Sequence, residues 1–322
     1  MSFFDELFGF AETTGDEIRA LLDLSGTTLT SQVNGRSFEV GTLTTPSLDE
    51  LREQDPSESS QIRVSEIVAD VQDLHRDPAN AGAFFQVASQ FNLLEMVGPY
   101  RTPEEGVGQY EQDLTQGPAC AIACGAGTVY RNWLVPVNGR PGQTSTRQID
   151  CLSDLGDAFG ADAWTMENGY ALATRDGLEQ IHNEIESSWG AGRDEFMELL
   201  RIGIQRDTEV TLSGAGHLVT QAYCSALPVA YSDHGSYAWE PFARLVLDAS
   251  YEATMRAAWQ NAERTGNRSV FLTMLGGGAF GNDTQWILDA MSRALDIFAH
   301  ADLDVQIVSY GSPVPELQPL LR

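Results

Sequence analysis

The chain contains the run Phe84-Phe85-Gln86-Val87-Ala88-Ser89-Gln90-Phe91-Asn92, which has the character of a buried strand. Apolar and small residues fill it, Pro and Gly are absent, and a polar Asn stands where the strand should end. An acid-rich segment follows at residues 102–113, and the turn Leu114-Thr115-Gln116-Gly117-Pro118 then leads into small residues at 119–127. A strand, a polar tip, carboxylates and a Gly-containing turn in this order are typical of a ligand site at the carboxyl end of an α/β sheet.

A glycine-rich loop near the C-terminus has a similar setting. Residues 269–274 predict a strand, residues 275–283 read Leu-Gly-Gly-Gly-Ala-Phe-Gly-Asn-Asp, and residues 283–299 predict an amphipathic helix. Glycines allow positive φ angles and bring backbone N–H groups close to a ligand, while the start of a helix attracts negative charge. The loop therefore predicts phosphate binding without a cationic side chain; a plain strand–helix turn is the alternative. We expect this loop and the segment after Asn92 to form two walls of one pocket.

The remaining pattern predicts an α/β domain with a smaller N-terminal extension. Residues 1–60 contain short helical patterns and a hairpin centred on Asn34-Gly35, and residues 61–322 form the expected main domain. The last third alternates between helix and strand, which favours a sheet with helices on both faces. Further helices are expected at 67–74, 177–188, 193–202 and 240–265, and strands at 84–91, 128–137, 169–174, 210–212, 218–231 and 304–310.

Composition and charge exclude several classes of function. The chain has 322 residues and a net charge of −27, so we expect neither nucleic acid nor an anionic membrane as a partner. All 19 basic residues are Arg, which excludes a lysine Schiff base and a phosphate loop built on Lys. No apolar run is long enough for a membrane span, and no cationic, hydrophobic leader is evident. We expect a cytoplasmic protein, or one exported without a cleaved signal.

The spacing of the Cys and His residues does not favour a metal site or a catalytic thiol. The four cysteines, Cys120, Cys124, Cys151 and Cys224, form neither a C-x-x-C pair nor a zinc pattern, and the five histidines are scattered. Cys120 and Cys124 lie among small apolar residues, where a free Cys usually packs as a small hydrophobe. We expect no metal, no cofactor and no catalytic cysteine.

Several of these motifs resemble the macrodomain superfamily. Residues 276–283 with the strand ending Ile307-Val308-Ser309-Tyr310-Gly311 are similar to the diphosphate loop and final strand of poly(ADP-ribose) glycohydrolases. The strand that ends at Asn92 resembles the macrodomain strand whose Asn faces the distal ribose. Residues 110–118 and 128–132 are similar to the MavL-type branch of the superfamily.

The resemblance covers about residues 60–315 and implies a fold, a ligand and a reaction. The implied fold is a macrodomain-like mixed sheet with helices on both faces. The implied ligand is ADP-ribose, and the MavL-type branch implies hydrolysis of ADP-ribose from arginine side chains of modified proteins, including that of ubiquitin.

The chain departs from poly(ADP-ribose) glycohydrolases at one point. Those enzymes carry a triple-Gly catalytic loop followed by paired glutamates. Here no Gly triplet follows Asn92; Glu104 and Glu105 precede Gly106, and Asp113 comes later. This departure argues against cleavage of the polymer and favours removal of a single ADP-ribose from arginine.

The candidate catalytic residues are the carboxylates Asp113, Glu105 and Glu104. An N-glycosidic bond at a ribose breaks through an oxocarbenium-like transition state, which a carboxylate can stabilise or supply with activated water. A carboxylate also suits a guanidinium leaving group. If residues 104–113 are helical, Glu105 and Asp113 share a face, whereas Glu111 points away. The alternative is that some of these residues are solvated surface charges.

The expected ligand-binding residues lie on the same two loops: Asn92, Gln116, Gly117, Gly276, Gly277, Gly278, Ala279, Phe280, Gly281 and Asn282. Asn92 and Gln116 could bond ribose hydroxyls, and Phe280 could stack on a ribose or belong to the core. We therefore expect a hydrolase that removes ADP-ribose from modified protein, with water as the nucleophile. A module that binds ADP-ribose without cleaving it, or a scaffold that has lost ligand binding, are the alternatives.

Overall fold

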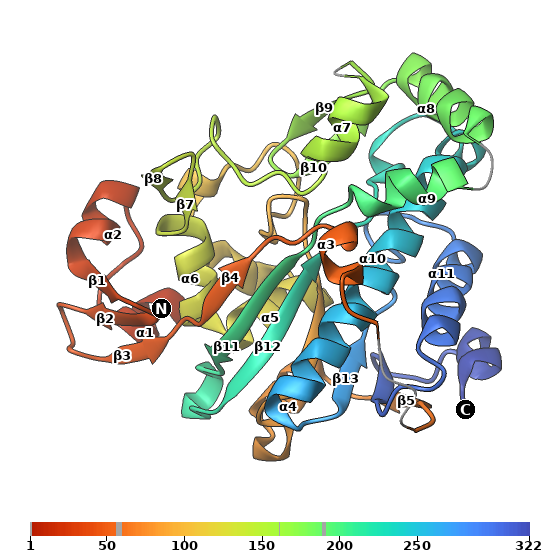
Figure 1. Cartoon of the computed structure of the whole chain (residues 1–322). Helices are drawn as coiled ribbons and strands as arrows, with labels where there is room; N and C mark the ends of the chain where they lie inside the picture. Colours follow the sequence, from red (N-terminus) through yellow and green to blue (C-terminus); the bar gives the residue numbers. More distant parts are fainter. Residues whose placement is uncertain (1, 56–59, 161, 189–190) are drawn as a thin grey trace.

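The centre of the protein is a seven-stranded mixed sheet, seen in a computed structural model that describes residues 2–55, 60–160, 162–188 and 191–322 (Figure 1). The strand order is β4 (Thr42–Thr44), β11 (Gly203–Glu209), β12 (Leu218–Cys224), β6 (Phe84–Ala88), β13 (Ser269–Leu272), β14 (Asp304–Ser309) and β5 (Arg63–Val68). Neighbouring strands from β12 to β5 are parallel, whereas β11 pairs antiparallel with both β12 and β4. The carboxyl ends of the parallel strands therefore meet along one edge, where ligands bind in open α/β sheets.

Helices cover both faces of this sheet: α4 (Val71–Arg76), α5 (Gln116–Ala123) and α6 (Gly125–Trp133) on one, and α10 (Ser236–Thr265) and α11 (Thr284–Ile297) on the other. Successive side chains of a strand point to opposite faces. Gln86 of β6 donates to Thr254 of α10, whereas Gln221 of β12, whose register partner is Phe85, donates to the Cys120 carbonyl of α5. The expected mixed sheet with helices on both faces is confirmed.

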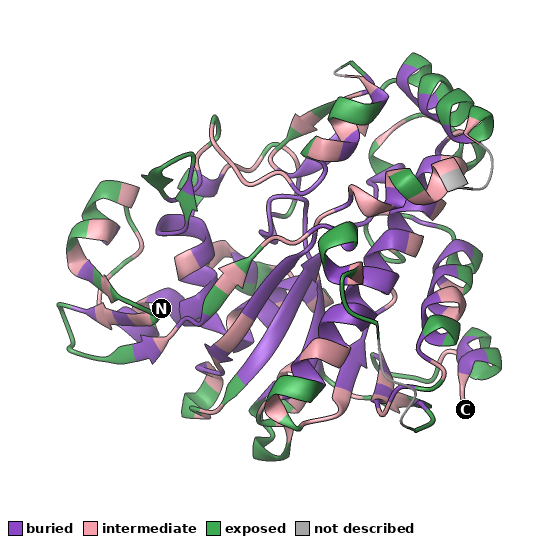
Figure 2. Cartoon of the chain, in the orientation of Figure 1, coloured by how far each residue is buried: buried purple, intermediate pink, exposed green. Residues whose placement is uncertain are grey.

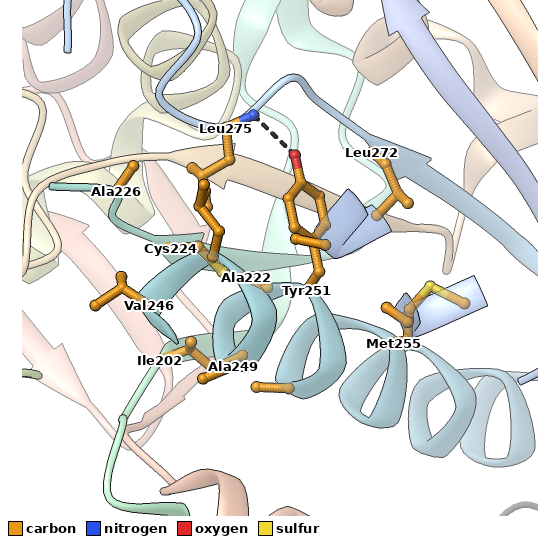
Figure 3. Packing of buried hydrophobic residues seen from close by; sticks show 14 of the residues in the cluster. Ile202, Ala222, Cys224, Ala226, Val246, Ala249, Tyr251, Met255, Leu272 and Leu275 are labelled. Carbon is orange, nitrogen blue, oxygen red and sulfur yellow. Dashed lines mark hydrogen bonds between the residues drawn. The ribbon is translucent and has the colours of Figure 1, made fainter. Parts of the chain in front are cut away.

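The helix α10 anchors the loop that follows β13. The Tyr251 hydroxyl donates to the carbonyl of Thr273 at 2.7 Å. It also accepts from the N–H of Leu275 at 2.9 Å (Figure 3). Tyr251 is fully buried among the apolar residues that join α10 to the sheet. Because both bonds involve backbone groups, α10 determines where the glycine loop leaves the sheet.

The N-terminal residues form a second apolar cluster beside the sheet (Figures 1 and 2). Its elements are α1 (Phe3–Phe8), α2 (Gly15–Leu21), β1 (Leu22–Ser25), β2 (Thr28–Ser31) and β3 (Ser37–Glu39). The predicted hairpin is confirmed, because β2 and β3 pair antiparallel around Asn34-Gly35. β4 and α3 (Leu48–Arg52) also precede residue 60, yet β4 pairs with β11 and α3 contacts α10. The domain boundary at residue 60 stays a prediction.

A long excursion separates α6 from β11. It contains β7 (Pro136–Val137), β8 (Arg140–Pro141), α7 (Ser153–Phe159), β9 (Trp164–Glu167), β10 (Tyr170–Ala173), α8 (Arg175–Ser187) and α9 (Ala191–Glu198). The strands form two separate antiparallel pairs, β7 with β8 and β9 with β10. Within the described residues, no helix combines the length and apolar character that a membrane crossing requires.

At least five predicted elements are wrong or misplaced, and among them the strand expected at 218–231 ends already at Cys224. The strand expected at 128–137 is mostly the helix α6. Thr128, Arg131 and Asn132 of this helix are buried and hydrogen-bonded. These tertiary contacts override the strand propensity of Thr, Val and Tyr. β6 ends at Ala88 instead of residue 91, because the chain turns to bond Phe91 to the Gly169 carbonyl. The helix at 67–74 is divided between β5 and α4, and the strand at 210–212 lies just past the end of β11.

Candidate functional site

Two adjoining pockets open at the carboxyl edge of the sheet. The glycine-loop pocket, about 180 Å³, lies between Glu95, Tyr170, Tyr231 and the loop that starts at Gly276. The Tyr310 pocket, about 660 Å³, lies between Asp70, Leu114, Ile122, Val308 and Tyr310. Four residues line both pockets: Asp113, Thr115, Gln116 and Thr273. The structure thus brings the two predicted loops together, and the two pockets adjoin at these four residues.

The glycine loop lines its pocket with residues whose backbone N–H groups have no protein acceptor among the described residues. Four of its residues line the cavity: Gly276, Gly278, Ala279 and Phe280. Within the described part of the chain, the N–H groups of these four residues donate to no protein acceptor. The other three N–H groups are used inside the loop: Gly277 donates to Met274, Gly281 to Gly278, and Asn282 to Gly276. Free and adjacent N–H groups at a cavity wall are suited to an anion.

Gly276 and Asn282 hold the loop in this shape. Gly276 has a φ of +77°, and a Cβ there would lie 2.4 Å from the Cβ of Ala226, so only Gly fits. The Asn282 side chain donates to the Leu227 carbonyl at 2.8 Å. The sequence predicts that the start of the following helix faces the ligand, but neither Asp283 nor Thr284 lines the pocket. The Asp283 carboxylate instead caps α11 by accepting from the Gln285 N–H at 2.8 Å.

The start of α5 forms another wall. The Gln116 side chain bonds the backbone at the end of β6, as a neighbouring strand would. It accepts from the Ala88 N–H at 2.9 Å and donates to the Gln86 carbonyl at 2.8 Å. A Cβ at Gly117 would lie 1.9 Å from the Ala88 carbonyl oxygen, so Gly lets the helix approach this closely. Among the described residues, the N–H groups of Gln116 and Gly117 have no acceptor, and the Thr115 side chain does not cap the helix. The positive end of α5 is therefore open to the pockets.

Asp113 is the predicted catalytic residue that lies in the site. It directly follows the 3-10 helix Gly108–Gln112, and its Oδ1 accepts from the Thr115 N–H at 2.9 Å. This bond holds the carboxylate at the border of the two pockets, both of which it lines.

Glu104 and Glu105 lie outside both pockets. Residues 103–105 and 108–112 are separate 3-10 helices, with Gly106 at a φ of +83° between them, so Glu105 and Asp113 do not share a helical face. Glu104 accepts from the N–H of Ser145 at 2.8 Å, and Glu105 accepts from Arg101 and from the Thr102 N–H. The Thr102 N–H and the Arg101 guanidinium lower the pKa of Glu105. Their contacts give these two carboxylates local structural roles.

Sequence reasoning missed Glu95, a buried carboxyl in the glycine-loop pocket. Its side chain is 1% exposed and accepts from the fully buried Arg131 of α6 at 3.2 Å and 3.3 Å. Burial raises the pKa of Glu95 to about 7, although the charge of Arg131 opposes the shift. Arg131 also donates to the hydroxyl of Tyr223. The sequence around residue 95 does not identify Glu95 as a site residue, because its ion-pair partner Arg131 lies 36 positions away in the chain.

An aromatic group closes the same pocket. Tyr170, Tyr231 and Phe280 have ring centroids 5.2–5.8 Å apart, and all three line the cavity. The Tyr170 hydroxyl donates to the Met96 carbonyl at 2.7 Å. Tyr170 and Tyr231 were not expected here, since they come from segments far from both loops. Phe280 therefore belongs to the pocket wall as well as packing against the core.

Asn92 lies away from both pockets and is fully buried. Its side chain accepts from the Leu94 N–H at 3.0 Å and donates to Gln148 at 2.7 Å. These bonds hold the turn that leads to Glu95. They also occupy the Asn92 side-chain amide. The strand ends three residues before its predicted end at residue 91, and for this reason Asn92 is not at its tip.

The Tyr310 pocket adds residues that follow two neighbouring strands. Asp70 comes after β5 and Tyr310 directly after β14, and these two strands pair in parallel. The Tyr310 side chain is 81% exposed at the pocket rim, beside the apolar Val308 and Ile122. An exposed ring and a carboxylate above an apolar floor suit a flat, nitrogen-rich ligand.

The cysteines are free and buried, and burial raises the pKa of each thiol. Across residues 2–55, 60–160, 162–188 and 191–322, no group of three His, Cys, Asp or Glu side chains is arranged to hold a metal ion.

No family model and no curated protein matches this sequence. Among solved structures, the chain is similar to poly(ADP-ribose) glycohydrolase from Deinococcus radiodurans in complex with ADP-ribose, with 14% identity, a TM-score of 0.42, and coverage of 86% of this chain and 94% of that one. It is also similar to poly(ADP-ribose) glycohydrolase from Thermomonospora curvata, with 12% identity, a TM-score of 0.43, and coverage of 94% and 92%. A likeness at this level says nothing about the chemistry of this chain.

Proposed function

We propose that this protein is an ADP-ribosylhydrolase that removes ADP-ribose from arginine side chains of modified proteins. The observation that carries the proposal is a pocket whose wall contains the free N–H groups of Gly276, Gly278, Ala279 and Phe280, together with the uncapped start of α5. Backbone N–H groups and a helix N-terminus bind a diphosphate without cationic side chains. This arrangement suits a protein that has no Lys and a net charge of −27.

The Tyr310 pocket would receive the adenosine half of the ligand. The exposed ring of Tyr310 offers a stacking surface for a purine, and Val308 and Ile122 offer apolar contacts. The Asp70 carboxylate, whose Oδ1 accepts from Gln72, can also accept from an exocyclic amine. With adenosine there, the diphosphate lies between the free N–H groups and the distal ribose enters the glycine-loop pocket.

Asp113 would activate the water that cleaves the bond. Water attacks C1″ of the distal ribose as the bond from C1″ to the guanidine nitrogen breaks. Asp113 accepts one proton of the water and passes it, directly or through solvent, to the leaving nitrogen, which also takes the bonding electron pair. The carboxylate also stabilises the oxocarbenium character of the transition state.

Glu95 would supply the second carboxyl of the site. Asp113 is partly exposed at the border of the pockets, whereas Glu95 is buried at the pocket wall with a pKa raised to about 7. Two carboxyls in such different surroundings can take different protonation states at neutral pH. A protonated Glu95 can donate a hydrogen bond to a ribose hydroxyl, and the Arg131 contact sets its orientation.

The arginine linkage is favoured by charge. A guanidinium leaving group is stabilised by nearby carboxylates, and a strongly acidic protein attracts basic substrate proteins. Ubiquitin modified on arginine is one substrate to test.

The deciding experiment compares peptides that carry ADP-ribose on arginine, glutamate or serine. We expect release from the arginine peptide to be faster than from the other two by at least about tenfold. Binding of free ADP-ribose without release from any peptide would make the protein a reader of the modification. Neither binding nor release would show that the pockets serve another purpose.

A further inference from the structure

The carboxylate of Glu12, far from the site in sequence, contacts the loop that leads to Asp113. Its Oε1 accepts from the N–H of Val107 at 2.9 Å and from the indole N–H of Trp133 at 2.6 Å. Its Oε2 accepts from the N–H of Gly108 at 2.7 Å. Gly108 is the first residue of the 3-10 helix that ends just before Asp113. Glu12 therefore caps this helix from a distant part of the chain.

The loop is built around that carboxylate. Gly106 has a φ of +83°, and a Cβ there would lie 2.5 Å from the Glu12 carboxylate. At Gly108 a Cβ would lie 3.1 Å from the same group. Both glycines let the backbone approach Glu12 closely, so the loop and the N-terminal segment fit each other as one unit.

The other end of the short helix is also bonded to the N-terminus. The N–H of Phe3 donates to the Glu111 carboxylate at 2.9 Å. Tyr110, between these contacts, is 1% exposed in the cluster that contains Phe3, and its hydroxyl accepts from the Glu95 N–H at 3.1 Å. The N-terminal segment thus contacts the helix at its start, its middle and its end.

We propose that Glu12 is a positioning residue of the hydrolytic site, which sets the place of Asp113 through the helix Gly108–Gln112. The inference rests on the proposed function, because it assigns Glu12 to the reaction that Asp113 performs. The N-terminal segment then belongs to the catalytic apparatus and is not a separable extension.

The substitution Glu12→Gln isolates this role. Gln has the same shape but one acceptor oxygen and an NH₂ group, whereas the carboxylate accepts from three donors. If the amide oxygen takes the place of Oε1, the NH₂ group faces the Gly108 N–H and the cap is lost. A displaced Asp113 slows turnover because small misplacements of a catalytic group are costly. Binding of free ADP-ribose is preserved, because Glu12 lines neither of the two pockets.

Two matched variants serve as controls. Glu17→Gln changes an exposed carboxylate of the same segment, which accepts from the Thr14 hydroxyl. Trp133→Phe removes the indole donor but leaves the bonds from Glu12 to Val107 and Gly108 in place. Both are expected to keep the helix Gly108–Gln112 and wild-type turnover within about threefold.

The experiment measures three quantities in the full-length protein: kcat on the arginine-linked peptide, the Kd of ADP-ribose, and amide exchange over residues 107–113. For Glu12→Gln we expect kcat to fall by at least about tenfold, Kd to change by less than about threefold, and exchange over 107–113 to quicken by at least about fivefold. If exchange over residues 107–113 quickens in Glu12→Gln but kcat is unchanged, the positioning role is wrong. It is also wrong if exchange over these residues is unchanged.

A wild type without turnover would contradict the proposed function instead. In that case the catalytic role of Glu12 fails with it, while the exchange measurement still decides whether Glu12 holds the loop. Glu12→Ala provides a second variant if the Gln protein does not fold, with the same expected pattern.

Discussion

The two walls of the glycine-loop pocket are held in place in different ways. The glycine loop is fixed by bonds among its own residues, such as Asn282 to Gly276, and by Tyr251 at its start. The wall that carries Asp113 is fixed by residues distant in sequence, including Glu12 and Tyr110 with its bond to Glu95. In the proposed function, the first wall supplies backbone groups for binding and the second supplies carboxyls for the reaction. Binding and turnover should therefore respond to different substitutions.

The largest expected effect is on turnover, and it follows from a substitution at Asp113. Asp113→Ala should lower kcat on the arginine-linked peptide by at least about 100-fold, because it removes the group that activates water. The Kd of ADP-ribose should stay within about tenfold, since the N–H groups of the other wall remain. Glu105→Gln is the matched control from the same segment and should keep wild-type turnover, because Glu105 lies outside both pockets. Full turnover in Asp113→Ala would mean that another residue activates water.

The next effect tests the glycine loop. Gly276→Ala should weaken ADP-ribose binding by about 1–3 kcal/mol, because Ala is strained at a φ of +77° and its Cβ meets Ala226. Gly277→Ala is the control, since Gly277 lines neither pocket and has no positive φ. Its Cβ would meet the flexible end of Ile287 at 3.1 Å and make ordinary van der Waals contacts with Met274. Calorimetry on folded proteins measures both. Equal affinities for the two variants would contradict the assignment of the diphosphate to this loop.

A smaller effect concerns the pH dependence of stability at Glu95. The folded-state pKa of about 7 lies above the ordinary value of 4.5, so the proton is held more tightly in the folded protein. The resulting stabilisation is complete below pH 4.5 and is lost as the pH rises through about 7. Urea unfolding of the wild type should show a decline on the order of 3 kcal/mol as the pH rises through this range. The decline should be absent in Glu95→Gln, and parallel pH curves for the two proteins would show that Glu95 does not titrate there.

The smallest effect belongs to the rim of the Tyr310 pocket. Tyr310→Ala should weaken ADP-ribose binding by about 1 kcal/mol, the lower end for stacking of a base on an aromatic ring, because this ring is 81% exposed. Tyr310→Phe keeps the ring and should bind like the wild type. Binding of ribose 5-phosphate should be the same in all three proteins. A loss for ribose 5-phosphate as well would place the base elsewhere.

Residue patterns were sufficient where the structure depends on neighbours in sequence. The strand, glycine loop and helix at 269–299 were predicted close to their observed bounds, and the long helix α10 begins four residues before the expected start at 240. These elements have local signals: a run of β-branched and aromatic residues, a glycine cluster, and Gly266 at a φ of +79° that ends α10. The proposal that this loop binds phosphate rests on the same local signals.

Three further features follow from the amino-acid sequence alone: the absence of Lys, the large negative charge, and the position of Asp113 just before a Thr-Gln-Gly-Pro turn. Only the tertiary structure decided which carboxyls meet in the pocket. Glu104 and Glu105 carry the same functional group as Glu95, but their backbone lies outside the cavity, while the fold buries Glu95 against Arg131. A local pattern cannot report such contacts, because the electrostatics of a carboxyl depend on burial and on partners that are distant along the chain.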